Sequence, residues 1–141
     1  MVNKVLFIDS NFIVGLTVDN DEWHEKAKEL IDYVDKKHKI TCLSVAFEAI
    51  TWINKKVGVN IAETVYDYLM DNFTIINEDR ILCDKAIKTL VKYHKLSLTD
   101  SIIVEIMKEM KLIELISFDT DFDRVERIVR IHDKNSMPKK C

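Results

Sequence analysis

Four acidic residues stand in this sequence where their carboxylates could act together. Asp9 and Asp119 each follow a short apolar run typical of a buried strand, within VLFIDSN and ELISFDT. Glu48 and Asp100 each interrupt apolar residues spaced as on one face of a helix, within LSVAFEAITW and LSLTDSIIV. A carboxylate in apolar surroundings is costly unless it is paired or binds a cation. The four positions together therefore predict a divalent-cation site.

The ligand type indicates which cation and which chemistry to expect. Carboxylate oxygens favour hard cations, Mg²⁺ or Mn²⁺, over Zn²⁺. Such an ion lowers the pKa of a bound water, positions it for attack on a phosphodiester and stabilises the developing charge. We expect Asp9, Asp100 and Asp119 to be metal ligands, and Glu48 to be a ligand or the group that orients the attacking water.

Each acid also has a structural explanation that the sequence leaves open. Asp9 precedes Ser-Asn and could cap a helix or close an Asx-turn. Glu48 could pair with a neighbouring lysine. Asp100 completes the capping-box pattern S-x-x-D that begins at Ser97. That role is compatible with metal binding, because a helix N-terminus favours an ionised carboxylate.

A second acidic pattern, D-x-D-x-D, runs from Asp119 through Asp121 to Asp123. It does not match a calcium-binding EF-hand loop, because Arg124 occupies the position of the required glycine and Arg130 that of the bidentate glutamate. A phosphoacceptor receiver domain is also disfavoured, since the residues beside Asp9 are Ile8 and Ser10 rather than a second acid.

The composition predicts one globular domain with mostly helical and strand structure. The chain has 141 residues, of which 48% are apolar and 32% charged, with only 2 Gly and 1 Pro. We assign residues 1–136 to a single domain and residues 137–141 to a C-terminal tail. The net charge of −3 is not typical of a nucleic-acid-binding protein.

The cysteines and the N-terminus indicate a reduced, cytoplasmic setting. There are 3 Cys, far apart and without a CxxC pattern, which disfavours a disulfide framework or a zinc site. The apolar run near the N-terminus stops at Asp9, too early for a signal peptide or a membrane span. We therefore expect no membrane association.

Hydrophobic periodicity predicts strands that alternate with helices. Such alternation indicates βαβ units, a parallel sheet and helices on both of its faces. Ligands then bind at the carboxyl ends of the strands, where Asp9 and Asp119 fall. The predicted strands are 2–8, 39–43, 73–76, 113–117 and 127–131, and the predicted helices are 12–18, 21–37, 44–57, 61–71, 79–94 and 99–110, with a turn or short helix at 119–123.

The order and spacing of these segments resemble the PIN-domain ribonucleases, and among them the small VapC-type toxins of toxin–antitoxin pairs. The resemblance rests on FIDSNFIVG, the helical Glu48, LSLTDSIIV and ISFDTDF, and it spans nearly the whole chain. It implies a PIN-like three-layer α/β/α fold around a parallel sheet of about five strands, often as a homodimer.

The resemblance also implies roles for particular residues. The acids matching Asp9, Glu48, Asp100 and Asp119 would bind Mg²⁺ or Mn²⁺ and catalyse hydrolysis of RNA, with Asp121 as an additional metal ligand. Asn11 and Ser117 would support these ligands by hydrogen bonds. The partners would be an RNA substrate and a small antitoxin protein. The alternative within the same fold is a non-toxin subunit that processes or binds RNA.

The segment after Asp123 is locally basic and supplies candidates for contact with RNA phosphates. They are Arg124, Arg127 and Arg130, although one or two of them could instead form structural ion pairs. Unpaired, exposed RNA is the expected substrate, because sequence-specific proteins mostly read single-stranded bases.

Overall fold

Five parallel strands form the centre of the structure, a computed structural model that describes residues 4–138. The strand order is β3-β2-β1-β4-β5. The strands are β1 (Val5–Ile8), β2 (His38–Cys42), β3 (Thr74–Ile76), β4 (Glu114–Ile116) and β5 (Val129–Ile131). The predicted parallel α/β fold is confirmed.

Successive side chains of the central strand β1 belong to two different hydrophobic clusters, one on each face of the sheet. Leu6 and Ile8 belong to one buried cluster, whereas Phe7 belongs to the other. Successive residues of a strand point to opposite faces, so each face of β1 carries large apolar groups that need a helical cover. All three residues are fully buried.

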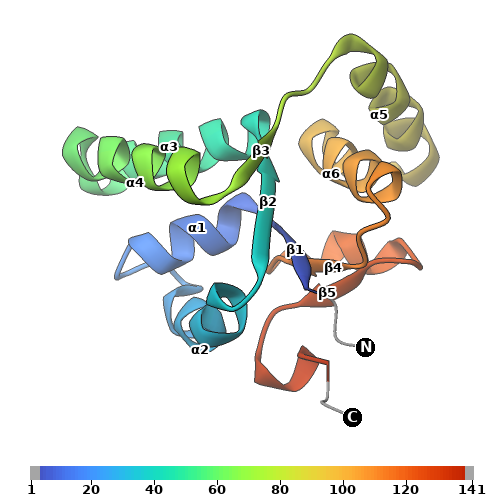
Figure 1. The fold of residues 1–141 in the computed structure, drawn as a ribbon. Helices are drawn as coiled ribbons and strands as arrows, with labels where there is room; N and C mark the ends of the chain where they lie inside the picture. Colours follow the sequence, from blue (N-terminus) through green and yellow to red (C-terminus); the bar gives the residue numbers. More distant parts are fainter. Residues whose placement is uncertain (1–3, 139–141) are drawn as a thin grey trace.

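The helices divide between these two faces, which gives the expected three layers (Figure 1). Helices α1 to α4 pack with Leu6 and Ile8, while α5 and α6 pack with Phe7. The helices are α1 (Ser10–Thr17), α2 (His24–Asp35), α3 (Leu43–Val57), α4 (Val59–Asn72), α5 (Arg80–Tyr93) and α6 (Leu98–Glu109), with 3-10 helices η1 (Thr120–Arg124) and η2 (Lys134–Ser136).

Most predicted boundaries differ from the observed ones by a few residues, and the reasons are local. Helix α1 begins at Ser10 rather than residue 12, because Asp9 caps it directly. Helix α2 begins only at His24, since Asp21 accepts a hydrogen bond from the backbone of Trp23 in a preceding turn. Gly58, at φ +99°, separates α3 from α4 in a conformation that suits glycine. The short helix η2 was not predicted.

The strand order creates a switch point between β1 and β4. From β1 the chain builds outward to β2 and β3, and it then returns to the other side of β1 to form β4 and β5. Crevices at such points, at the carboxyl ends of the strands, are the usual ligand sites of parallel sheets. Asp9 directly follows β1 and Asp119 lies shortly after β4.

The C-terminal segment is partly tied to the domain. Met137 packs, half-buried, against the cluster that covers Leu6 and Ile8, and Lys26 pairs with Asp133 at 3.9 Å. The predicted tail from residue 137 thus starts in contact with the core, and its residues 139–141 lie outside the described part. In the described part, no helix is long and apolar enough to cross a membrane.

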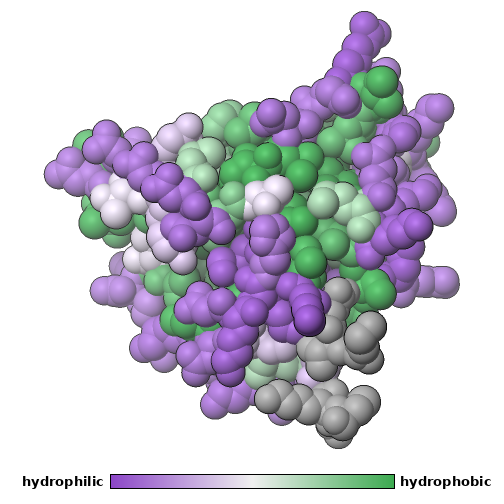
Figure 2. Space-filling model, viewed as in Figure 1, coloured by the Kyte–Doolittle hydropathy of each residue, from purple (hydrophilic) through white to green (hydrophobic). Residues whose placement is uncertain are grey.

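Apolar side chains also reach the surface. Figure 2 shows them gathered in the middle of one face, between the helices α3 and α4 on one side and α5 on the other. Large exposed apolar residues along these helices include Phe47, Val59, Ile81 and Val91, each at least 52% exposed. Exposed apolar patches are typical of surfaces that bind other proteins, membranes or ligands.

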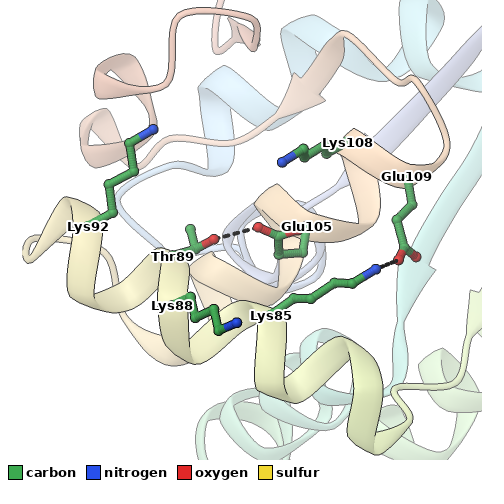
Figure 3. A pocket seen from close by; sticks show the side chains of 7 residues that line it. All are labelled: Lys85, Lys88, Thr89, Lys92, Glu105, Lys108 and Glu109. Carbon is green, nitrogen blue, oxygen red and sulfur yellow. Dashed lines mark hydrogen bonds and ion pairs between the residues drawn. The ribbon is translucent and has the colours of Figure 1, made fainter.

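A buried hydrogen bond between α5 and α6 yields a stability prediction. Thr89 donates its hydroxyl to Glu105, and both side chains lie in buried positions (Figure 3). Thr89→Val should lower the free energy of unfolding by about 1–3 kcal/mol, because the buried carboxylate loses its donor. Urea denaturation measures this change. Thr64→Val is the matched control, since Thr64 bonds only to Asn60 on an exposed helix face, and an equal loss in both variants would contradict the account.

Candidate active site

Asp9 is the most deeply placed of the predicted acids. Its side chain caps α1, and Oδ1 accepts the backbone N–H of Ser10 at 2.8 Å. Oδ2 accepts the hydroxyl of Ser117 at 2.7 Å. Only 5% of the residue is exposed. The capping role that the sequence left open is therefore real, and it holds the carboxylate at the carboxyl end of β1.

Ser117 links the two strand-end acids. Its fully buried side chain donates to Asp9 and accepts the backbone N–H of Asp119 at 3.1 Å. Asn11 donates to the same hydroxyl at 3.3 Å and accepts the N–H of Phe118 at 3.2 Å. Ser117 thus contacts both strand-end acids, and Asn11 reaches them through Ser117 and Phe118.

Asp100 reaches the same edge from the start of α6. It forms the predicted capping box: Ser97 accepts the backbone N–H of Asp100 at 3.0 Å, and Asp100 accepts that of Ser97 at 3.3 Å. The residue is half-buried. The positive end of the helix dipole favours a charged carboxylate there.

Asp119 caps the short helix η1 and accepts the N–H of Asp121 at 2.9 Å. The carboxylate of Asp121 itself accepts a hydrogen bond from Arg124 at 2.7 Å. Asp121 therefore joins the site through its backbone, while its side chain forms an ion pair. Its role as an additional metal ligand stays a prediction.

Glu48 approaches from α3 and is the most exposed of the four acids. The sequence placed it on a face with Val45, Ala49 and Trp52. Val45 and Ala49 are fully buried as expected, but Trp52 is 48% exposed, so this face runs from the core out to solvent. Ser10 lines the same hollow as Glu48, and its side chain partly offsets the rise that burial causes in the pKa of Glu48. Glu48 thus lies at the rim, next to the cap of α1.

The pKa values indicate that these carboxylates interact electrostatically. Burial, with smaller effects from the charges of Asp100 and Glu48, raises the pKa of Asp9 to about 7, although the Ser117 and Ser10 hydrogen bonds partly offset the shift. Burial also raises the pKa of Asp100 to about 6, with the charge of Asp119 as the next cause. The pKa of Glu48 is raised by loss of surrounding water. The four acids therefore form one electrostatic group.

The donor chemistry fits a hard divalent cation, since the group offers carboxylate oxygens supported by a hydroxyl and an amide. A bound cation would favour the ionised carboxylates and so offset the burial and the mutual repulsion that raise the pKa values of Asp9 and Asp100. Across residues 4–138, however, no three His, Cys, Asp or Glu side chains are drawn together tightly enough to enclose an ion. The carboxylates surround the edge of the sheet without closing on one point.

The three arginines differ in how available they are. Arg130 binds both oxygens of Asp123, at 2.9 and 3.1 Å, and the carbonyl of Ser117, and its side chain is only 9% exposed. Its hydrogen bond lowers the pKa of Asp123. Arg124 and Arg127 are exposed, and the latter donates to Val104 at 3.4 Å. Arg130 therefore supports β5 and Ser117, and Arg124 and Arg127 are the more accessible candidates for phosphate contact.

A basic groove between α5 and α6 was not predicted from the sequence (Figure 3). Four lysines line it against two glutamates: Lys85, Lys88, Lys92, Lys108, Glu105 and Glu109. The groove was hard to predict because its lysines are spread over two helices and become neighbours only when the helices pack. Their spacing along α5, three and four residues apart, was the available signal.

A second hollow, of about 340 Å³, adjoins the acidic group itself. Ser10, Asn11 and Glu48 form its inner wall, and Trp23, Trp52 and Lys56 are among the residues that continue it outward. Trp23 stacks on Phe118 with ring centroids 4.9 Å apart. Neither Ser10 nor Trp52 was predicted to belong to the site.

Comparison with known proteins settles the family. The family model described as PIN domain matches residues 6–128, which include all four acids. The chain belongs to the PIN domain family. No curated protein sequence matches it.

Similar solved structures include a toxin and a toxin–antitoxin complex. VapC20 of Mycobacterium tuberculosis, described as a sarcin–ricin loop cleaving toxin, is 21% identical with a TM-score of 0.77, covering 87% of this chain and 96% of that one. A toxin–antitoxin complex from Klebsiella pneumoniae is 22% identical with a TM-score of 0.68, covering 88% and 95%. VapBC2 of Rickettsia felis, bound to promoter DNA, is 11% identical with a TM-score of 0.65, covering 90% and 97%. At these identities the likeness concerns the fold.

The raised pKa values predict how the stability of this PIN domain depends on pH. Asp9 and Asp100 bind protons more tightly when folded than when unfolded, so the folded state holds more protons between about pH 4 and pH 7. Without divalent cations, the free energy of unfolding should therefore fall as pH rises through this range. Asp9 alone can contribute up to about 1.4 kcal/mol per pH unit.

Asp9→Asn keeps an oxygen that can cap α1 but cannot ionise, so it should flatten this decline. Urea denaturation in EDTA at several pH values measures the effect. Asp67→Asn, at an exposed position of α4, is the control and should leave the profile unchanged. A wild-type stability that rises from pH 4 to pH 7 would contradict the raised pKa values.

Proposed function

We propose that this protein is an Mg²⁺- or Mn²⁺-dependent endoribonuclease that hydrolyses RNA phosphodiester bonds, and that it acts as the toxin of a toxin–antitoxin pair. The observation that carries the proposal is the convergence of Asp9, Glu48, Asp100 and Asp119 into one electrostatic group at the switch point of a PIN fold. The likeness to toxin structures supports the toxin role.

The strand-end and helix-start acids would hold the cation. Asp9 is fixed by two hydrogen bonds, Asp100 by its capping box and Asp119 by the turn into η1. These caps keep each carboxylate at the edge of the sheet, and the carboxylates would have to draw closer together to enclose an ion. A bound Mg²⁺ or Mn²⁺ would lower the pKa of a coordinated water and stabilise charge on the phosphodiester.

Glu48 would act on the attacking water and would not serve chiefly as a metal ligand. It lies at the exposed rim, where water can reach it, and its raised pKa makes it a better proton acceptor. Ser10 lies beside it in the same hollow, and Asp9 caps the helix that carries Ser10. Asn11 and Ser117 would keep Asp9 and Asp119 in register with each other.

The proposed partners follow from exposed apolar surface and from the assemblies of the similar structures. Ile50, Val59, Ala62 and Tyr66 line an open groove between α3 and α4. An antitoxin helix with an apolar stripe could fill such a groove. The similar structures include toxin–antitoxin complexes. We propose an antitoxin partner and a homodimer on these grounds. A cytoplasmic location is proposed because the cysteines are far apart and Cys42 and Cys83 are free.

Replacement of Asp100 tests the catalytic assignment. Asp100→Asn keeps the size of the side chain and an acceptor for the capping box but removes one charge from the metal site. Cleavage of a structured RNA should fall by at least about 100-fold, as for other single groups that stabilise the transition state. Circular dichroism should remain that of the folded wild type.

The control for Asp100→Asn is Asp84→Asn, which removes an exposed charge from α5 that pairs only with Arg80. It should retain wild-type cleavage. Equal activity of Asp100→Asn and wild type would exclude Asp100 from the mechanism.

Metal binding should also stabilise the fold without any reference to activity. Because the ion binds the native state, Mg²⁺ or Mn²⁺ at 100 times its dissociation constant should add about 2.7 kcal/mol to the free energy of unfolding. Thermal melts in EDTA and in increasing Mn²⁺ measure the shift. Asp9→Asn should abolish most of it, and a wild-type midpoint that does not move at millimolar metal would contradict a metal site.

A further inference from the structure

Helix α3 carries a line of three different functional groups outward from the acidic site. Glu48, Trp52 and Lys56 are spaced four residues apart, so they form one stripe on the helix surface. All three line the hollow that begins at Ser10 and Asn11. The stripe offers, in order, a carboxylate, an aromatic ring and a cation.

Trp52 exposes its ring at the surface of the hollow instead of packing into the core. It is 48% exposed although it borders the site, and the ammonium of Lys55 lies 5.3 Å from the ring centroid. The hollow's other tryptophan, Trp23, is held by its stacking on Phe118 and gives a firm wall. An exposed ring beside a phosphodiester site can stack on a base, because every nucleobase has a flat π-face.

The charges of the hollow favour a base over a phosphate. Asp21, Glu22 and Glu48 contribute three carboxylates to its lining, against one lysine, Lys56. A phosphate would be repelled there, whereas an exocyclic amino group of a base can donate to a carboxylate. Asp21 already accepts the backbone N–H of Trp23, while Glu22 is exposed at the rim.

We propose that this hollow is a nucleobase subsite for a single-stranded RNA nucleotide next to the scissile phosphate, a proposal that rests on the proposed ribonuclease function. The base stacks on Trp52, and its amino group donates to Glu22. Lys56, one turn further along α3, contacts the following phosphate. The subsite therefore selects adenine, cytosine or guanine, which carry an exocyclic amino group, over uracil.

Two variants test stacking in cleavage of a single-stranded RNA by the otherwise intact protein. Trp52→Ala should raise KM at least about fivefold with little change in kcat, because stacking binds substrate and transition state alike. Trp52→Phe should restore most of the affinity, since a smaller aromatic face remains. Phe47→Ala is the matched control, an exposed aromatic on the same helix that lies outside the lining of the hollow.

Base selection is tested by binding, which does not require cleavage. Labelled oligo(A), oligo(C) and oligo(U) are titrated against the Asp100→Asn protein, with and without Glu22→Gln. Adenine and cytosine oligomers should bind more tightly than uracil oligomers, and Glu22→Gln should reduce that difference. Equal binding of all three oligomers would overturn the proposed selectivity.

The outcomes of these experiments distinguish a failure of the proposed subsite from a failure of the proposed ribonuclease function. If the wild type cleaves RNA while Trp52→Ala keeps its KM, the subsite is wrong and the nuclease assignment stands. A Trp52→Ala protein that loses affinity only for a protein partner would likewise overturn the subsite. If the wild type neither cleaves nor binds RNA, both proposals fail.

Discussion

Burial of carboxylates close to one another at one edge of the sheet is the constraint on which the rest of the structure depends. Parallel strands bring Asp9 and Asp119 to the same edge, and α6 and α3 add Asp100 and Glu48. Burial is the main reason that the pKa of Asp9 is raised to about 7, and the charges of Asp100 and Glu48 add to it. The surrounding structure must therefore supply donors that hold the charges in place.

The fold supplies these donors mainly through the ends of helices. Asp9, Asp100 and Asp119 each cap a helical segment and accept backbone N–H groups that would otherwise lack partners. Ser117 then joins Asp9 to Asp119 across two strands. The structural and the functional explanations of these acids are thus the same interactions. Burying ionisable carboxylates at this position lowers the stability of the folded state, as is common in active sites.

The sequence predicted those features that depend on local pattern. The strand-then-acid order at Asp9 and the S-x-x-D box at Asp100 are short-range signals, and both proved to mark helix caps at the site. Features that arise from packing were missed or misjudged: Trp52 fits a core stripe by spacing but is half exposed, because that face of α3 extends beyond its buried neighbours. For the three arginines the sequence left open RNA contact or structural ion pairs, and Arg130 pairs with Asp123 and Ser117, which only the fold brings near.

The most direct test of the account is the position of a bound ion. Crystals of the protein soaked in Mn²⁺ can be measured at the manganese absorption edge, where only the metal gives a strong anomalous signal. The account predicts a peak bordered by Asp9, Asp100 and Asp119, with Glu48 on its solvent side. No peak at that edge of the sheet at millimolar Mn²⁺, or a peak only at remote surface acids, would contradict it.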